Sequence, residues 1–170
     1  MATLHHNISG ELTKELLAPS DNYRVTRISL ANVQKVSKCK IDLYIEKKLT
    51  GRFYLLKNVD LPKGSTLIYD DIKFSNATNE FGLYTKLTDG ENFTITGSID
   101  PAASTTVPGS GTAFLSELSV GDEIVVSGET KTISAIASDT SLTVTSAFSN
   151  NANDLTPDCN PTALVDIIIN

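Results

Sequence analysis

Few residues in this chain have the types and spacing that catalysis or metal binding requires. The two histidines, His5 and His6, are adjacent and close to the N-terminus. A Ser-His-Asp or Cys-His arrangement would have to draw that end of the chain into a cleft. Two imidazoles without neighbouring carboxylates also make a weak metal site. Cys39 and Cys159 lie far apart in the sequence and form no CxxC pair, which predicts buried, inert thiols.

Paired carboxylates at Asp70-Asp71 and Asp122-Glu123 raise a calcium or acid–base hypothesis. Neighbours on a strand point to opposite faces, so we expect these pairs to serve turns and solvation instead. The run Gly109-Ser110-Gly111-Thr112 lacks the lysine of a phosphate-binding loop and is expected to be a turn. We therefore predict no catalytic residues, no metal site and no cofactor. The protein is expected not to be an enzyme.

Charge is sorted along the sequence. Residues 1–86 hold 13 basic and 9 acidic side chains, whereas residues 87–170 hold 1 basic and 11 acidic side chains. A single core gives no reason for this asymmetry, but an inserted acidic module does. Ser, Thr and Asn are abundant after Asp89, which favours short strands and turns. No stretch reaches the roughly 20 apolar residues that span a bilayer, and we expect a soluble protein.

Period-two alternation predicts strands in the first half of the chain. Apolar Cys39, Ile41, Leu43 and Ile45 alternate with Lys40, Asp42, Tyr44 and Glu46, the pattern of a half-buried strand. Residues 47–51 are expected to turn the chain into an antiparallel partner at 52–56. Further strands are expected at 23–30, 66–69 and 81–86. The apolar run 164–169 must then return to pair with strands made early in the chain, which closes a β-sandwich.

The N-terminal residues are expected to form a short arm outside this sandwich. Leu12 and Leu16 are four positions apart, which fits one or two helical turns before Pro19. The acidic region predicts a meander at 118–126, 130–136 and 142–145, completed by apolar residues into a small barrel: Phe93, Ile95, Val107, Phe114 and Leu115. The predicted fold is all-β, an antiparallel sandwich (23–88 plus 160–170) with an N-terminal arm (1–22) and an inserted acidic module (89–159).

Two sets of segments resemble phage proteins. Residues 106–114, 118–122 and 138–144 resemble a small β module found, usually as an insert, in structural proteins of tailed bacteriophages. The flanking segments 25–32, 41–45, 54–64 and 165–169 are similar to a family of small virion proteins from such viruses. The resemblance implies a structural component of the virion, made in the host cytoplasm. It implies no catalytic residue, because none defines the family.

We expect a capsid decoration protein that binds other virion proteins in many copies, with a neck, connector or tail position as the alternative. Candidate partner-binding residues are the leucines of the arm and a basic cluster: Leu12, Leu16, Leu17, Lys35, Lys38, Lys40, Lys47, Lys48 and Arg52. The net charge of −6 argues against nucleic acid as the partner. We expect the basic cluster to face an acidic protein surface, in the simplest case the acidic half of another copy.

A carbohydrate-binding or adhesive module for host recognition is the alternative from another class. That role requires exposed aromatic rings beside polar groups. The acidic module contains Phe93, Phe114 and Phe148, all expected in its core, and the chain has no Trp.

Overall fold

The computed structural model describes residues 3–47, 50–77, 80–101, 103–149 and 152–170. Within these ranges nearly all regular structure is β-strand, and the helix α1 (Phe114–Glu117) is a single turn. The all-β prediction is therefore confirmed. No helix in the described residues has the length and apolar character needed to cross a membrane. The chain divides into two compact units. The first comprises the chain up to Gln34, Lys38–Asp89 and Ala163–Asn170, and the second comprises Lys35–Ser37 and Gly90–Thr162.

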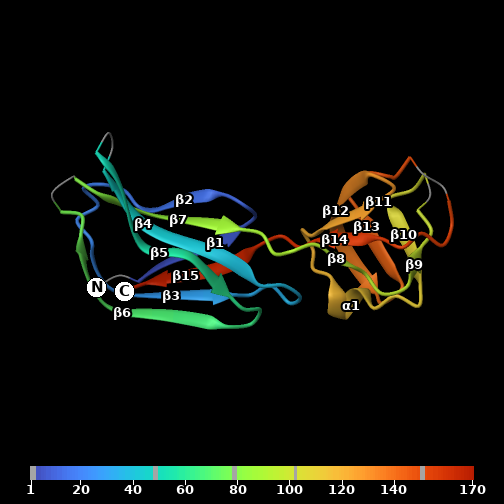
Figure 1. Ribbon diagram of the computed structural model, residues 1–170, viewed down its shortest axis with the longest axis horizontal. Coiled ribbons are helices and arrows are strands. Elements are labelled where there is room, and N and C mark those ends of the chain that lie inside the picture. Colours follow the sequence, from blue (N-terminus) through green and yellow to red (C-terminus); the bar gives the residue numbers. More distant parts are fainter. Residues whose placement is uncertain (1–2, 48–49, 78–79, 102, 150–151) are drawn as a thin grey trace. The chain divides into compact units, whose positions relative to one another are not determined.

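The first unit is a sandwich of two four-stranded antiparallel sheets, ordered β1-β15-β3-β6 and β2-β7-β4-β5 (Figure 1). Its strands are β1 (Leu4–Ser9), β2 (Thr13–Leu17), β3 (Arg24–Asn32), β4 (Cys39–Lys47), β5 (Gly51–Leu61), β6 (Thr66–Ser75), β7 (Gly82–Thr88) and β15 (Leu164–Ile169). When the strands are numbered within this unit alone, β15 becomes strand 8, and the strand orders of the two sheets are 1-8-3-6 and 2-7-4-5. This interleaved order is that of the eight-stranded jelly roll, built from two Greek keys.

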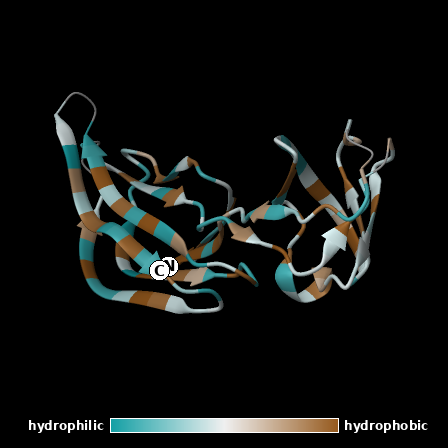
Figure 2. Cartoon of the chain, turned by 45° about the vertical axis from the view of Figure 1, so that its right-hand side comes forward, coloured by the Kyte–Doolittle hydropathy of each residue, from teal (hydrophilic) through white to brown (hydrophobic). Residues whose placement is uncertain are grey.

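Alternating side chains fill the space between the two sheets. Figure 2 shows apolar and polar residues succeeding one another along these strands. The inward positions of β3, β4 and β15 are fully buried in one core, among them Val25, Ile28, Leu30, Ile41, Leu43, Val165, Ile167 and Ile169. Burial of these aliphatic side chains supplies most of the stabilisation of the unit.

The N-terminal segment is part of this sandwich, which corrects the predicted helical arm. Strand β1 pairs with β15, and β2 pairs with β7, so each sheet gains an edge strand from the first 17 residues. A register shift between Glu15 and Leu17 turns both Leu16 and Leu17 into the core. Because the bulge buries two consecutive leucines, β2 lacks the alternation that marks a strand in the sequence.

The C-terminal strand returns to the early part of the chain, as predicted, and lies between β1 and β3. It does not pair with Ile41–Ile45, because β4 belongs to the facing sheet. The hairpin of β4 and β5 is confirmed, with Tyr44 opposite Tyr54 and Glu46 opposite Arg52.

The second unit is a seven-stranded antiparallel sheet that carries its own core. Its order is β8 (Phe93–Thr94), β14 (Asp158–Asn160), β11 (Glu123–Val126), β12 (Glu129–Ser138), β13 (Ser141–Val144), β10 (Thr106–Ser110) and β9 (Ser98–Ile99). The predicted three-stranded meander is confirmed as β11, β12 and β13. The core includes Ile95, Val107, Phe114 and Phe148. Leu115 is 52% exposed, contrary to prediction, because the helical turn that buries Phe114 rotates the next side chain outward.

These bounds change the charge balance. The first unit holds 12 basic and 11 acidic residues, and the second holds 2 basic and 9 acidic residues. All of the net negative charge therefore belongs to the inserted unit, at −7, while the sandwich is close to neutral, at +1.

Candidate interaction surface

The outer face of the β2-β7-β4-β5 sheet carries a row of tyrosines. Cross-strand pairing aligns Tyr84 of β7, Tyr44 of β4 and Tyr54 of β5, with Glu15 of β2 opposite Tyr84. Charged residues of the same face surround the row. We call this surface the tyrosine face and define it by Glu15, Asp42, Tyr44, Glu46, Arg52, Tyr54, Lys57 and Tyr84.

The rings of this face form a packed stack. A side chain at Gly82 would meet the Tyr84 ring at 2.8 Å, so the absence of a Cβ allows that ring to lie against the strand. Tyr44 stacks on Tyr84 with ring centroids 5.7 Å apart, and its other side contacts Tyr54 at 5.5 Å. The Arg52 guanidinium lies 4.1 Å from the Tyr44 ring centroid. Tyr44 is thereby buried although it points away from the sandwich core.

Ion pairs fix the cations of the tyrosine face. Arg52 donates from Nε to a Glu46 carboxylate oxygen at 2.9 Å, and Lys57 lies 3.0 Å from a carboxylate oxygen of Asp42. The Lys57 ammonium also lies 4.3 Å from the Tyr54 ring centroid. A hydrogen bond with Tyr54, and then Glu46, raises the pKa of Arg52. The pKa of Lys57 is raised chiefly by Asp42, whereas Arg52 lowers the pKa of the Tyr54 phenol.

The pKa values of Tyr84 and Tyr44 are shifted upward, in the opposite direction to that of Tyr54. Burial, followed by the hydrogen bond to Glu15, raises the pKa of Tyr84 to about 12. Its hydroxyl donates to a Glu15 carboxylate oxygen at 2.9 Å. Burial is also the main cause of the raised pKa of Tyr44. The Tyr44 hydroxyl is buried and makes no hydrogen bond of good geometry with the described residues. These phenols therefore stay neutral at physiological pH and act through their rings.

The accessible part of this face lies along β5. Tyr54 is 41% exposed; the neighbouring Phe53, 54% exposed, points to the other side of β5, where it lies opposite Ile45. Phe53 meets the Phe81 ring edge-on at 5.9 Å, and Lys47 lies 5.9 Å from the Phe81 centroid. Of the residues of the tyrosine face, Tyr54 and Arg52 are of the types in which interaction hot spots are enriched.

The predicted basic cluster is not one continuous positive patch. Lys38 is ion-paired with Asp60, Lys47 with Glu80 and Arg52 with Glu46. Lys40 lies on the outer face of β4, opposite Asp60 of β5. Lys35 belongs to the second unit, so it is not on the same body as the others. Lys48 lies outside the described residues. Local carboxylates thus offset most of the charge that the sequence concentrates in this region.

The three predicted arm leucines have different environments. Leu16 and Leu17 are buried in the sandwich core, which corrects their assignment as partner-binding residues, because a side chain inside the core cannot reach another protein. Leu12 is 38% exposed at the turn between β1 and β2. It alone of the three presents apolar surface to solvent.

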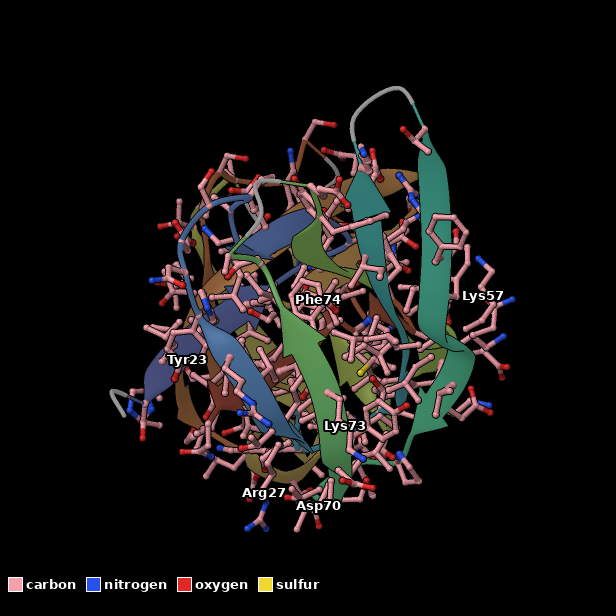
Figure 3. The ribbon with its side chains drawn as sticks, turned by 90° about the vertical axis from the view of Figure 1, so that its left-hand side faces the viewer. Tyr23, Arg27, Lys57, Asp70, Lys73 and Phe74 are labelled. Carbon is pink, nitrogen blue, oxygen red and sulfur yellow. The ribbon has the colours of Figure 1, made fainter. Side chains whose placement is uncertain are left out.

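The other acidic side chains that were candidates for chemistry make structural contacts instead. Asp70 is ion-paired with Arg27 at 3.2 Å across β6 and β3, and the two side chains lie together in Figure 3, where Lys57 projects from a different strand. The buried Asp122 carboxylate accepts hydrogen bonds from the backbone N–H groups of Ser119 and Thr162 at 2.8 and 2.9 Å. No group of three or more His, Cys, Asp or Glu side chains in the described ranges is arranged to hold a metal ion.

Both cysteines are buried, reduced thiols, as predicted. Burial raises the pKa of Cys39 to about 11 and raises that of Cys159 further in the same direction. Neither thiolate is populated at neutral pH, so neither is a nucleophile there.

The tyrosines of this face were absent from the sequence-based candidates, although a usable signal existed. Tyr44 and Tyr54 lie on the predicted hairpin, and a pairing centred on its turn places them opposite each other. Tyr84 could not be added without knowing that β7 is the second neighbour of β4.

Comparison with known proteins adds no family. No family model and no curated protein matches the chain. Among solved structures, the PBSX exported protein XepA has 9% sequence identity and a TM-score of 0.26, covering 99% of this chain and 84% of that one. An infectious bursal disease virus structure, Gx strain, has 11% identity and a TM-score of 0.25, covering 99% of this chain and 41% of that one. Similarity at this level carries no argument about function.

Proposed function

We propose that this chain is a structural component of a tailed-phage virion that decorates the capsid, where it works by binding and not by catalysis. The observation that carries the proposal is a jelly-roll sandwich with an acidic unit inserted between its last two strands, β7 and β15. Jelly rolls occur in viral capsid proteins and also in lectins and cupins. The fold alone does not choose among these. The resemblance of both units' segments to tailed-phage virion proteins favours the first.

The tyrosine face is the proposed attachment surface. It replaces the N-terminal arm in this role, because Leu16 and Leu17 belong to the core. Tyrosine and arginine dominate the energetics of protein interfaces, and rigid side chains lose little entropy on binding. Here Glu46 holds Arg52, while Tyr44 and Arg52 support the ring of Tyr54. The face is therefore preorganised for a partner before contact.

The proposed partners are other virion proteins. Nucleic-acid binding depends on cations that can neutralise phosphates. Lys38, Lys47, Arg52 and Lys57 are each ion-paired with a carboxylate of the sandwich itself. This arrangement supports a protein surface with mixed polar and aromatic groups as the complement.

A binding experiment with the full chain tests the proposal. Wild-type protein, Tyr54→Ala and the control Ile68→Ala are added separately to purified capsids and to purified neck and tail assemblies, and co-sedimentation is measured. Ile68 is similarly exposed but lies on the opposite sheet. We expect capsid binding that falls by about 30-fold in Tyr54→Ala, the size of a hot-spot loss, and is unchanged in Ile68→Ala. Binding to neck or tail assemblies alone would establish the connector or tail alternative. Binding to neither would refute the virion role.

Carbohydrate recognition is the second candidate, and one observation favours it. The rings expected to matter in the inserted unit are core residues or pack against its core, as with Phe114, Phe148 and Phe93. The sandwich, however, exposes Tyr54 beside the Lys57–Asp42 pair. A ring flanked by polar groups can stack on a sugar. Glycan-array binding by the full chain that is lost in Tyr54→Ala, without capsid binding, would replace the decoration role by this one.

A further inference from the structure

The two edges of the β1-β15-β3-β6 sheet differ in how they are protected against pairing. The β6 edge carries Asp70, Asp71 and Lys73 and is interrupted by a register shift, with Asp71 at a φ of 59°. The β1 edge contains Leu4–Ser9, with no Lys, Arg, Asp, Glu, Pro or Gly, and pairs with β15 through six consecutive residues without a shift. Charges and bulges are the usual devices that keep a sheet edge from adding another strand. The β1 edge has neither.

The hydrogen-bond pattern shows which backbone groups of β1 face outward. The Gly10 N–H donates to the Ala163 carbonyl at 2.8 Å. Hydrogen-bonded pairs recur at every second residue of an antiparallel ladder, so Ile8, His6 and Leu4 also bond to β15. On the other side of β15, the Val33 N–H donates to the Leu164 carbonyl at 3.0 Å. The residues of β15 therefore alternate between bonding to β1 and bonding toward β3. The backbone groups of His5 and Asn7 therefore point off the edge.

The sequence of this strand is self-complementary about His6. We propose that β1 is a dimerisation edge, on which two copies of this chain pair antiparallel around a two-fold axis at His6 and join their four-stranded sheets into one of eight strands. In this register Leu4 lies opposite Ile8 of the second copy, and His5 opposite Asn7. The outward-facing groups of each strand then meet those of the other and form four backbone hydrogen bonds.

Side chains on the inner face of the strand suit this pairing. Ile8 is buried in the sandwich core and Leu4 packs against it, so their cross-pairs would extend that core between the copies. His6 lies opposite its counterpart, and its Nε2 atom is buried without a hydrogen-bond partner among the described residues.

The imidazole of His6 is neutral at physiological pH. Burial is the first cause of its lowered pKa, and Lys14 of β2 is the second. His5 of β1 acts in the same direction, while the Leu16 backbone of β2 opposes them. Asp166 of β15 accepts a hydrogen bond from Asn7 at 2.6 Å on the outer face of the sheet. Two neutral imidazoles can face each other without the repulsion that two cations would suffer.

Sedimentation of the full chain over a range of concentrations tests the dimer. His5→Pro removes an outward N–H without removing a bond to β15, and proline is tolerated at such edge positions. By symmetry the substitution deletes two of the four hydrogen bonds. We expect it to weaken dimerisation by roughly tenfold or more. Ile68→Pro is the matched control on β6. The Asn32 N–H donates to the Ser65 carbonyl, so every second residue of β6 from Ser65 bonds to β3. The Ile68 backbone lies between these positions and therefore also faces outward. We expect the control to dimerise like the wild type.

Cysteine cross-linking tests the register independently of the proline variants. In the proposed pairing the two His6 Cα atoms are about 4.5 Å apart, within the range of a disulfide. His6→Cys should therefore form a covalent dimer under mild oxidation. Ser9→Cys should not, because the two copies of position 9 are about 20 Å apart in this register. Cys39 and Cys159 are buried and do not compete.

A monomeric wild-type protein at all concentrations up to about 100 μM, the weak end of specific association, would overturn the proposal. So would a dimer unaffected by His5→Pro, or cross-linking through Ser9→Cys that equals that through His6→Cys.

Discussion

Leu17 decides whether the N-terminal segment belongs to the sandwich or lies outside it. Its side chain is 2% exposed and packs in the core from strand β2. Truncation of such a leucine to alanine costs the transfer free energy of the lost methyl groups plus the cavity they leave, about 2–5 kcal/mol. Leu12, five positions earlier, is 38% exposed. We expect Leu17→Ala to lower the free energy of unfolding by about 2–5 kcal/mol and Leu12→Ala to lower it by about 1 kcal/mol or less.

Tyrosine fluorescence makes this comparison specific to the sandwich. All five tyrosines lie in the first unit and the chain has no tryptophan, so the inserted unit does not contribute to the signal. With a urea m-value of about 2 kcal/mol/M, the midpoint should fall by roughly 1–2.5 M for Leu17→Ala and by roughly 0.5 M or less for Leu12→Ala. Far-ultraviolet circular dichroism in the same titrations follows both units together.

Equal and small shifts for the two variants would refute the placement of β2 in the core and restore the predicted arm outside the sandwich. Deletion of residues 2–18 gives a second reading of the same question. It removes an edge strand from each sheet together with buried Ile8, Leu16 and Leu17. Their summed cost is about the whole stability of a domain of this size, roughly 5–15 kcal/mol. The deletion variant should therefore not fold, rather than fold and merely lose its partner.

Four further predictions follow from local geometry. Gly82→Ala should displace the Tyr84 ring and reduce both near-ultraviolet dichroism and stability, by about 1–3 kcal/mol, because its Cβ would lie 2.8 Å from that ring; an unchanged spectrum would contradict the stack. In an absorbance titration toward high pH, Tyr54→Phe should remove a phenol that ionises at lower pH than an ordinary tyrosine, and Tyr84→Phe one that ionises at higher pH. Since the folded pKa of Tyr84 is raised to about 12, its contribution to stability is present below about pH 10 and is lost as the pH rises through the folded value. Asp122→Asn should speed amide exchange in the inserted unit, because an amide oxygen replaces only one of the two carboxylate acceptors; unchanged exchange would show that these bonds are dispensable. Replacement of residues 90–162 by a short glycine linker should leave a cooperative tyrosine-detected unfolding transition, and its loss would show that the sandwich depends on the insert.

Sequence alone predicted those strands that place an apolar side chain toward the core at every second position. Cys39 to Ile45 of β4 and the strands β11 and β13 are of this kind, and shifts in the pairing register do not hide their pattern. The N-terminal strand β2 was missed for a physical reason. The register shift between Glu15 and Leu17 buries two consecutive leucines, which removes the alternation by which a strand is recognised.

The tyrosine face depends on tertiary pairings that the sequence does not display. Asp42 and Tyr44 were assigned to a polar, solvated face, yet both are buried on it. Tyr44 lies beneath side chains from β5 and β7, and shifts in the β4–β5 register decide which residues of β5 reach it. The predicted charge asymmetry was likewise correct as composition, but it did not show that carboxylates on the same sheet pair with Arg52 and Lys57.

The junction between the units explains how a jelly roll can hold a folded insert of this size. The chain leaves the sandwich at Asp89 and re-enters it at Ala163, and the Asp89 carboxylate accepts a hydrogen bond from the Ala163 N–H at 2.6 Å. The exit and entry points are therefore adjacent, so closing the connection costs little more than closing a short loop. The insert can then carry the net negative charge of the chain without placing it among the strands that form the core and the tyrosine face.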